Sequence, residues 1–258
     1  MGALPEMSYP IVDPARRNSA LASKCALAVM AKAPRPGKVK TRLSPPLTAE
    51  QAAALNICFL RDTARNIADV AAASEASGLV SYTPVGDEGL FDGLLPVGFR
   101  LVAQRGDGFG ERLLAATEDI LACGFGAVCL INSDSPTLPA NALRHAAEEL
   151  NRPGDRIVLG GASDGGYYLI GMKAPHSEPF TGIHWSTATV YAETVAAIAR
   201  AGVDLVELPV WYDVDDGETL KLLQDELLRS IPPPFATAPG YPAPYSRSFL
   251  LETVGVSE

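Results

Sequence analysis

The chain has 258 residues, of which 47% are hydrophobic and 20% are charged, and its formal net charge is −9. These values are ordinary for a globular protein and exclude wholesale disorder and a coiled coil. The negative charge argues against nucleic acid or an anionic membrane as a partner. No apolar run approaches the ~18 residues of a membrane-spanning helix, so we expect no membrane segment.

Residues 1–23 lack the apolar stretch of a secretory signal, and we predict a flexible leader. From 24 to 231, short apolar runs alternate with amphipathic stretches, which predicts one domain of strands and helices. The first apolar run, 26–31, suits a buried strand. Thr48 and Gln51 form a capping box that begins the first helix, whose apolar residues recur every three or four positions.

The later elements follow from the same two periodicities. Further strands are predicted at 79–83, 99–102, 127–131 and 203–208. Further helices are predicted around 113–121, after Pro139, up to Gly202 and over 217–229. Two more apolar runs, 156–159 and 167–171, flank a loop rich in glycine and aspartate, and this pattern predicts a hairpin.

Residues 232–258 form a proline-rich tail that cannot continue the last helix, although its aromatic side chains could pack on the domain. Alternating strands and helices predict a mostly parallel sheet with helices on both faces, and the hairpin makes the sheet mixed. The predicted fold class is therefore α/β, a Rossmann-like three-layer α/β/α architecture. In such sheets ligands bind beyond the carboxyl ends of the strands.

The segment 32–42 directly follows the first predicted strand and contains five basic and no acidic residues. Pro36 and Gly37 permit a tight turn. Lysine offers a point charge and arginine a bidentate fork, which together suit a diphosphate or triphosphate. The Walker-A phosphate-binding pattern is absent. A solvated basic loop is the alternative interpretation.

Aspartates follow two other predicted strands. Asp134 lies just after the predicted strand 127–131 and could hold magnesium, which takes one or two carboxylates together with phosphate oxygens. Alternatively, Asp134 or Ser135 caps the next helix. Near the end of the domain, Asp215 is assigned to the metal, and Asp216 to the cap of the helix over 217–229.

Three further segments are candidate ligand contacts. Asp164 in the glycine-rich hairpin loop could accept hydrogen bonds from a hydroxyl-rich substrate, or form a plain turn. The segment with Gln104, Gly106 and Asp107 could approach a base or ribose, although it lacks the complete dinucleotide-binding glycine pattern. Trp185 and Ser186 precede a helix, where a buried tryptophan and a helix cap are the alternatives.

With these segments placed, five ordered motifs appear, namely K-x-P-x-P-G-x-V-K-T-R-L, S-D-S-P, A-x-D-G-G-Y-Y-L-I-G, W-S-T and D-V-D. Over about 25–227 the chain resembles the bacterial glycosyltransferase-like family long catalogued as a domain of unknown function and linked by name to arsenosugar biosynthesis. This family belongs to the nucleotide-diphospho-sugar transferase superfamily. The resemblance implies a GT-A-like fold.

The same resemblance implies roles for individual residues. Nucleotide phosphates would be bound by Lys32, Lys40, Thr41 and Arg42. The metal would be held by Asp134 and Asp215. The donor sugar or the acceptor would be lined by Asp164, Gly165 and Gly166. Neither the D-x-D motif of many glycosyltransferases nor the G-x-G-T-R signature of sugar nucleotidyltransferases is complete here, so the sequence leaves the chemistry open.

The favoured function is metal-dependent glycosyl transfer, with Mg²⁺ or Mn²⁺, from a nucleotide-diphospho-sugar to a small-molecule acceptor. Lys40, Arg42 and Asp164 are the candidate catalytic residues. One alternative is nucleotidyl transfer to a phosphorylated small molecule with release of pyrophosphate, as in phospholactate guanylyltransferase; another is nucleotide binding without turnover. The four cysteines form no C-x-x-C pair, which favours a reducing, cytoplasmic location. Each function requires the basic loop to face Asp134 across one cleft.

Overall fold

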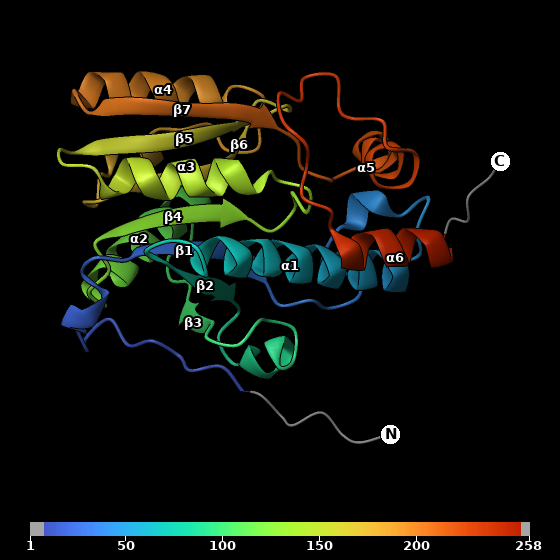
Figure 1. Cartoon of the computed structure of the whole chain (residues 1–258), viewed down its shortest axis with the longest axis horizontal. Coiled ribbons are helices and arrows are strands. Elements are labelled where there is room, and N and C mark those ends of the chain that lie inside the picture. The colour runs from blue at the N-terminus through green and yellow to red at the C-terminus, as the bar shows by residue number, and fades with distance from the viewer. Residues whose placement is uncertain (1–7, 254–258) are drawn as a thin grey trace.

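The computed structural model describes residues 8–253 and contains a seven-stranded sheet with helices on both faces (Figure 1). The strands are β1 (Cys25–Lys32), β2 (Ala76–Thr83), β3 (Arg100–Ala103), β4 (Ala127–Asn132), β5 (Arg156–Ala162), β6 (Tyr167–Met172) and β7 (Asp204–Trp211). They lie in the order β3-β2-β1-β4-β6-β5-β7. Only β6 runs antiparallel to its neighbours β4 and β5, so the mixed, mostly parallel sheet is confirmed.

The helices form the two outer layers of the domain. They are α1 (Ala49–Ala71), α2 (Phe109–Ala122), α3 (Ala140–Asn151), α4 (Val190–Ala201), α5 (Gly217–Arg229) and α6 (Pro244–Thr253). Leu27 and Val29 of β1 pack with α1 and α3, whereas Ala26 and Ala28, which alternate with them, pack with α2 on the opposite face. Because successive strand residues point to opposite faces, a continuous apolar strand fills both cores. The three-layer α/β/α prediction is confirmed.

Local signals set the helix boundaries as predicted. The capping box is present, because Gln51 donates its amide to Oγ1 of Thr48 at 3.2 Å and Thr48 donates its amide to Oε1 of Gln51 at 2.8 Å. Gly202 ends α4 in the left-handed conformation with φ 70°. By contrast, α3 begins after Pro139 without a side-chain cap. The alternative in which Asp134 or Ser135 caps that helix is therefore wrong.

Residues 9–12 pack along the β3 edge of the sheet, and the amide of Asn18 donates to the carbonyl oxygen of Cys123 at 2.8 Å, at the end of α2. Tyr9 is buried and donates its hydroxyl to the carbonyl oxygen of Leu95 at 2.6 Å. The amide of Val12 donates to the carbonyl oxygen of Leu101, in β3, at 2.8 Å. Parts of the predicted leader thus contact the domain, because an apolar ring and backbone groups find partners there; residues 1–7 lie outside the described residues, and the flexibility of the leader stays a prediction.

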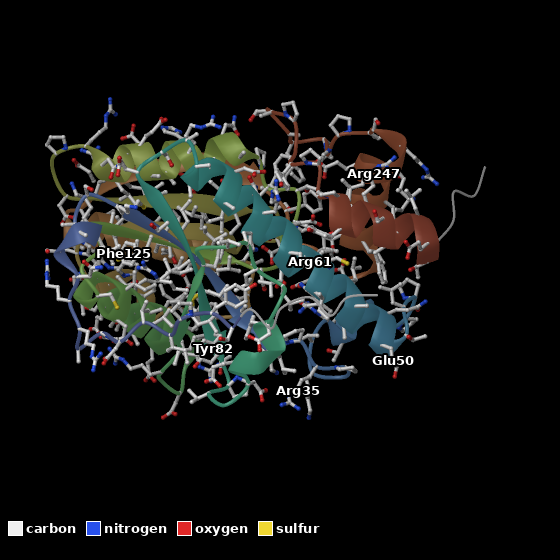
Figure 2. All side chains as sticks on the ribbon, turned by 60° about the horizontal axis from the view of Figure 1, so that its bottom comes forward. Arg35, Glu50, Arg61, Tyr82, Phe125 and Arg247 are labelled. Atoms are coloured by element: carbon white, nitrogen blue, oxygen red, sulfur yellow. The ribbon has the colours of Figure 1, made fainter. Side chains whose placement is uncertain are left out.

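The tail contains a helix, α6, that the sequence did not predict. Figure 2 shows it beside α1, where the guanidinium of Arg61 lies 4.1 Å from the ring centroid of Tyr245. The buried carboxylate of Asp62 accepts hydrogen bonds from the amides of Tyr245 and Ser246 at 3.0 and 2.8 Å. A proline inside a helix would remove a backbone hydrogen bond. Pro244, however, lies in the first turn of α6, where an amide has no acceptor within the helix, so no hydrogen bond is lost.

Candidate active site

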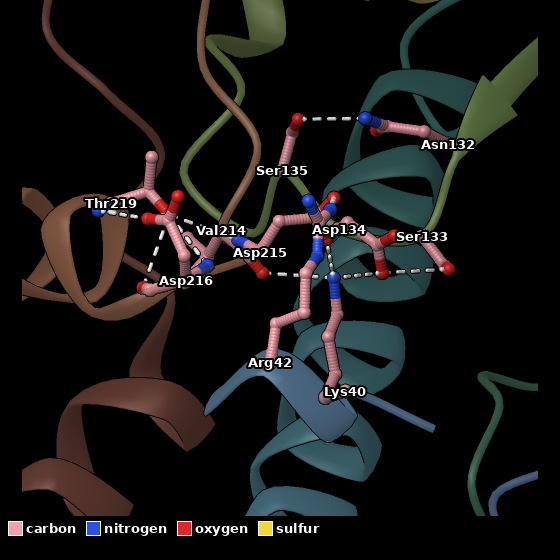
Figure 3. A network of polar contacts seen from close by, with 10 residues as sticks. All are labelled: Lys40, Arg42, Asn132, Ser133, Asp134, Ser135, Val214, Asp215, Asp216 and Thr219. Carbon is pink, nitrogen blue, oxygen red and sulfur yellow. Dashed lines mark hydrogen bonds and ion pairs between the residues drawn. The ribbon is translucent and has the colours of Figure 1, made fainter. Parts of the chain in front are cut away.

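Three loops that carry charged side chains meet at one edge of the sheet. They follow β1, β4 and β7, whose carboxyl ends lie at the same edge because these strands run in the same direction. The first loop supplies Lys40 and Arg42, the second Asp134 and the third Asp215 (Figure 3). Lys40 and Asp215 are 175 positions apart in the sequence. The convergence expected from the sequence is therefore observed.

The ammonium group of Lys40 lies at the centre of this site. Its Nζ is 2.9 Å from Oδ1 of Asp134 and 2.7 Å from Oδ1 of Asp215, and it donates to the carbonyl oxygen of Val214 at 2.8 Å. Burial by itself lowers the pKa of Lys40, but the two carboxylates outweigh burial and raise that pKa above its ordinary value. Lys40, whose side chain is only 5% exposed, therefore remains charged and bridges the two acidic loops.

The backbone at Lys40 is left-handed, with φ 50° and ψ 39°, which is uncommon for a residue other than glycine. Lys40 directly precedes a short helical turn, η2 (Thr41–Leu43), which carries Arg42. Nη2 of Arg42 lies 2.6 Å from Oδ2 of Asp215. Strained backbone of this kind concentrates at functional sites. Here the side chains of Lys40 and Arg42, two positions apart in the sequence, both reach the carboxylate of Asp215.

The loop after β7 is fixed from two sides. Asp216 begins α5 by accepting a hydrogen bond from the amide of Thr219 at 2.9 Å, so its predicted role as a helix cap is observed. The amide of Asp215 donates to Oγ1 of Thr219 at 2.9 Å. The amide of Val214 donates to the carbonyl oxygen of Asp134 at 2.8 Å. These contacts leave the carboxylate of Asp215 facing the basic loop.

Two adjacent pockets open at this site, with volumes of about 240 Å³ and about 520 Å³. The smaller, here named the basic pocket, is lined by residues that include Lys32, Lys38, Lys40, Thr41 and Asn56. The larger, here named the carboxylate pocket, is lined by residues that include Asp164, Asp213, Phe109, Tyr167, Trp185 and Ser186. Arg42, Ser133, Asp134 and Asp215 line both, so the two pockets share one wall.

One wall of the carboxylate pocket depends on a close backbone approach at the β5–β6 hairpin. Gly165 has φ +90°, and a Cβ there would lie 2.1 Å from the carbonyl oxygen of Ala188. Its own carbonyl oxygen accepts a hydrogen bond from the amide of Tyr191 at 2.8 Å. Oδ1 of Asp164 closes the turn by accepting from the amide of Gly166 at 2.8 Å. Glycine therefore lets the loop before α4 lie against the hairpin.

Aromatic rings form another wall of the carboxylate pocket. The rings of Phe109 and Trp185 meet edge to face with centroids 5.0 Å apart, and those of Tyr167 and Trp185 lie 6.3 Å apart. Trp185 is half-buried, while Phe109 is 51% exposed. Ser186 has a left-handed backbone with φ 64°. α4 begins only at Val190, so the alternative in which Ser186 caps that helix is wrong.

Asp213 is the most perturbed carboxylate of the site. Burial first, and then the negative charges of three neighbouring aspartates, raise its pKa to about 7. Those neighbours are Asp164, Asp215 and Asp134. A carboxyl group that titrates near neutral pH can accept or donate a proton during a reaction.

Comparisons with known proteins identify the family of the chain. Residues 66–187 match the model of a family described as an uncharacterized protein conserved in bacteria (DUF2064). The structure of a candidate nucleotide-diphospho-sugar transferase from Desulfovibrio desulfuricans G20 is similar over 90% of this chain and 96% of that one, with 30% identity and a TM-score of 0.75. The chain belongs to the DUF2064 family, within the nucleotide-diphospho-sugar transferase superfamily.

A more distant similarity concerns the fold alone. The structure of CMP:2-keto-3-deoxy-manno-octonic acid synthetase in complex with CTP covers 81% of this DUF2064 protein and is itself covered completely, at 11% identity and a TM-score of 0.51. None of the curated proteins matches the chain.

The structure brings together most residues that the sequence selected in this DUF2064 protein. Lys32, Lys40, Thr41 and Arg42 line the basic pocket, and Asp164, Gly166, Trp185 and Ser186 line the carboxylate pocket. Pro36 and Gly37 belong to the basic loop without lining a pocket, and Gly165 shapes a wall from behind. Their roles in binding stay predictions.

Three selected residues, Gln104, Gly106 and Asp107, line neither pocket. Nε2 of Gln104 donates to the carbonyl oxygen of Ser81 at 2.7 Å. The amide of Asp107 donates to Oε2 of Glu111 at 2.9 Å, at the start of α2. The glycine-rich pattern in this segment therefore begins a helix, and a nucleotide contact there stays a prediction.

Several lining residues were not assigned a role from the sequence, among them Asn56, Phe109, Tyr167 and Asp213. Asp213 had a visible signal, because it lies two positions before Asp215 in an extended segment and so shares its side. Tyr167 directly follows the hairpin loop. Asn56 is a buried polar residue on the apolar face of α1. A buried polar side chain normally has a hydrogen-bond partner, so its position was a signal.

The carboxylates of Asp134 and Asp215 are suitable ligands for a divalent cation that binds together with a phosphate group. Both already face one positive charge, the Lys40 ammonium, at 2.9 and 2.7 Å. Within residues 8–253, no group of three or more His, Cys, Asp or Glu side chains is arranged to hold a metal ion. Magnesium needs only one or two carboxylates when phosphate oxygens complete its shell. The donor set therefore suits a metal–nucleotide complex better than a metal alone.

In the part of the chain that the structure describes, no helix combines the length and the apolar character needed to traverse a lipid bilayer.

Proposed function

We propose that this DUF2064 protein is a metal-dependent glycosyltransferase that uses a nucleotide-diphospho-sugar donor and a small-molecule acceptor. The observation that carries the proposal is the shared wall between a pocket lined by lysines and a larger pocket lined by carboxylates and aromatic rings. A nucleotide sugar has the same division, with a diphosphate at one end and a hydroxyl-rich ring at the other. Its scissile bond would lie at the wall.

The basic pocket is suited to the diphosphate that departs. When the bond between the anomeric carbon and the diphosphate oxygen breaks, the electron pair leaves with the diphosphate and negative charge develops there. Lys32, Lys40 and Arg42 would stabilise that charge. Mg²⁺ or Mn²⁺ held by Asp134 and Asp215 would supply further Lewis-acid stabilisation of the phosphates.

The carboxylate pocket is suited to the attacking acceptor. A hydroxyl oxygen of the acceptor forms the new bond to the anomeric carbon and must lose its proton. Asp164 is our candidate to take this proton, and Asp213, with its pKa raised to about 7, is a second carboxyl group with suitable acidity.

Nucleotidyl transfer is the second candidate, because one observation favours it. The basic pocket gathers Lys32, Lys38, Lys40 and Arg42 in only about 240 Å³, and a triphosphate requires more cations than a diphosphate. In that reaction an acceptor phosphate attacks the α-phosphorus and pyrophosphate leaves.

The leaving group separates these functions. The protein is incubated with Mg²⁺ or Mn²⁺ and small-molecule acceptor extracts, and with either nucleotide sugars or nucleoside triphosphates. We expect metal-dependent release of nucleoside diphosphate from a nucleotide sugar. Release of pyrophosphate from a triphosphate would show the second function instead. Tight nucleotide binding with neither product would show a binding protein.

A matched pair of lysine variants ties the product to the site. Lys40→Gln removes the buried ammonium group, whereas Lys221→Gln removes an exposed lysine on α5 that lines neither pocket. We expect product release to fall strongly for Lys40→Gln only. Circular dichroism and urea unfolding of both variants check that the loss is not a failure to fold.

A further inference from the structure

We infer that the carboxylate pocket accepts an uncharged, hydroxyl-rich ring and excludes phosphorylated molecules. This inference rests on the proposed function and names the class of molecule that reacts there. It also bears on the choice between the two candidate reactions, because nucleotidyl transfer needs a phosphorylated acceptor.

The charges of the carboxylate pocket disfavour a phosphate group. Four aspartates line it, whereas its only lysine or arginine among the described residues is Arg42. Arg42 is already paired with Asp215 at 2.6 Å. Asp164 and Asp213 form no ion pair within residues 8–253. A phosphate group that enters beside Asp164 and Asp213 would face these two carboxylates with no unpaired lysine or arginine of the described residues lining the pocket to offset them, and like charges brought together in this way disfavour binding.

Unpartnered polar atoms carry the second step. Tyr167 and Asn132 line the pocket, and the hydroxyl of Tyr167 and Oδ1 of Asn132 are buried without a hydrogen-bond partner among the described residues. Buried polar atoms are rarely left unpaired in the functioning state of a protein. Hydroxyl groups of a ligand can both donate and accept, so they suit a carbonyl oxygen, a phenol and a carboxylate equally well.

The aromatic wall carries the third step. Trp185 is half-buried, and its ring is held at fixed angles by Phe109 and Tyr167. An apolar wall opposite polar groups is the usual composition of a site for a ring that has an apolar face and hydroxyls at its rim. The phosphate group of a sugar phosphate gains nothing from such a wall. The pocket volume of about 520 Å³ is large enough for more than one sugar-sized ring.

Tryptophan fluorescence tests this inference directly. The chain has two tryptophans, and Trp211 is buried, so a response to a ligand of the carboxylate pocket should come from Trp185. The full chain is titrated, with Mg²⁺ and a nucleoside diphosphate present, with glucose, galactose, mannose and N-acetylglucosamine and with the 6-phosphate of each. We expect at least one free sugar to change the emission, its 6-phosphate to bind roughly tenfold more weakly or worse, and Trp185→Phe to lose the response.

Removal of one charge sharpens the test. Asp164→Asn keeps an oxygen that can accept from the amide of Gly166 but loses the negative charge. This variant should narrow the difference between sugar and sugar phosphate severalfold. The control Asp204→Asn removes the same charge at the opposite end of β7 and should leave the difference unchanged.

Two outcomes would overturn the inference. One is that a sugar 6-phosphate binds as tightly as its parent sugar, and the other is that Trp185 responds to none of the free sugars. Calorimetric titration of the nucleoside diphosphate into the same samples reports on the basic pocket separately. Nucleotide binding without sugar binding would therefore reject this inference alone, whereas loss of both would reject the proposed function.

Discussion

The basic pocket and the carboxylate pocket share a wall but are built in different ways. Most of the basic pocket comes from one contiguous loop, 32–42, at the end of β1. The carboxylate pocket combines side chains that follow β4, β5 and β7 with the start of α2 and the loop before α4. Affinity for phosphate can therefore reside in a single stretch of sequence, whereas the shape that selects a substrate requires several distant segments.

Their electrostatics differ as well. In the basic pocket, Lys40 and Arg42 are paired with the two carboxylates of the shared wall at 2.6 to 2.9 Å. In the carboxylate pocket, burial first and then the negative charges of neighbouring aspartates raise the pKa of Asp213 to about 7. This difference is what the proposed function requires, because a leaving diphosphate needs cations and an attacking hydroxyl needs a proton acceptor.

The largest expected effect comes from the shared wall. Asp134→Ala removes a carboxylate that belongs to both pockets and pairs with Lys40. We expect nucleotide affinity in the presence of Mg²⁺ to fall at least about a hundredfold, because the proposed metal loses a ligand. Nucleotide affinity measured in EDTA should be unchanged or higher, because Lys40 loses one of its two carboxylate partners and can bind phosphate more readily. Calorimetry measures both conditions.

Asp204→Ala is the control for Asp134→Ala, since Asp204 is an exposed aspartate at the opposite end of β7. It should bind nucleotide like the natural protein in both conditions. If Asp134→Ala kept its metal-dependent binding, Asp134 would not belong to the metal site and the shared wall would lose its proposed role.

The second effect concerns Asp213 and stability. In the unfolded chain its pKa returns to the ordinary value of 3.8, so between about pH 4 and 7 the folded protein holds a proton that the unfolded chain has released. The free energy of unfolding contributed by this group therefore falls as the pH rises through that window. Asp213→Asn should be more stable than the natural protein at pH 8, by about 2 kcal/mol after screening, and little different at pH 4.

Urea unfolding in EDTA at pH 4, 6 and 8 measures this dependence. Asp204→Asn, which removes a charge of the same kind, should follow the natural protein at all three values. An Asp213→Asn variant that gained no stability at pH 8 would contradict the raised pKa.

The third effect tests the wall of the carboxylate pocket through its backbone. Gly165→Ala meets both a positive φ and the carbonyl oxygen of Ala188, whereas Gly182→Ala meets a positive φ of 72° with no atom within 4 Å. We expect Gly182→Ala to lose about 1 kcal/mol of stability and Gly165→Ala about 1 kcal/mol more. Thermal unfolding compares them, and equal losses would show that the close approach is not needed.

The smallest effect is expected at the rim of the basic pocket. Lys38 is exposed and lines this pocket, but it forms no ion pair among the described residues. Lys38→Ala should weaken nucleotide binding only severalfold, and the difference should shrink at high salt because an exposed charge is screened. Titrations at 50 mM and 500 mM salt test this, with Lys221→Ala as the control. A loss that did not depend on salt would contradict a purely electrostatic role.

Local sequence determined the order of elements and the fold class of this DUF2064 protein. The apolar run of β1, the Thr48–Gln51 capping box and the Gly202 helix end each act within a few residues, so they are readable without tertiary contacts. The helix α6 was missed because its position depends on Asp62, nearly two hundred residues earlier, which accepts the amides at its start. The basic loop was readable as well, because its charges are contiguous.

Tertiary structure alone decided which polar residues meet. Lys40, Asp134 and Asp215 are held together by strand order, and Asn56 and Phe109 join the pockets only through the packing of their helices. The raised pKa of Asp213 has the same origin, because burial and the field of neighbouring charges arise from distances that no local pattern encodes. The sequence by itself thus determined the elements and the charged loop, and folding decided which charges face one another.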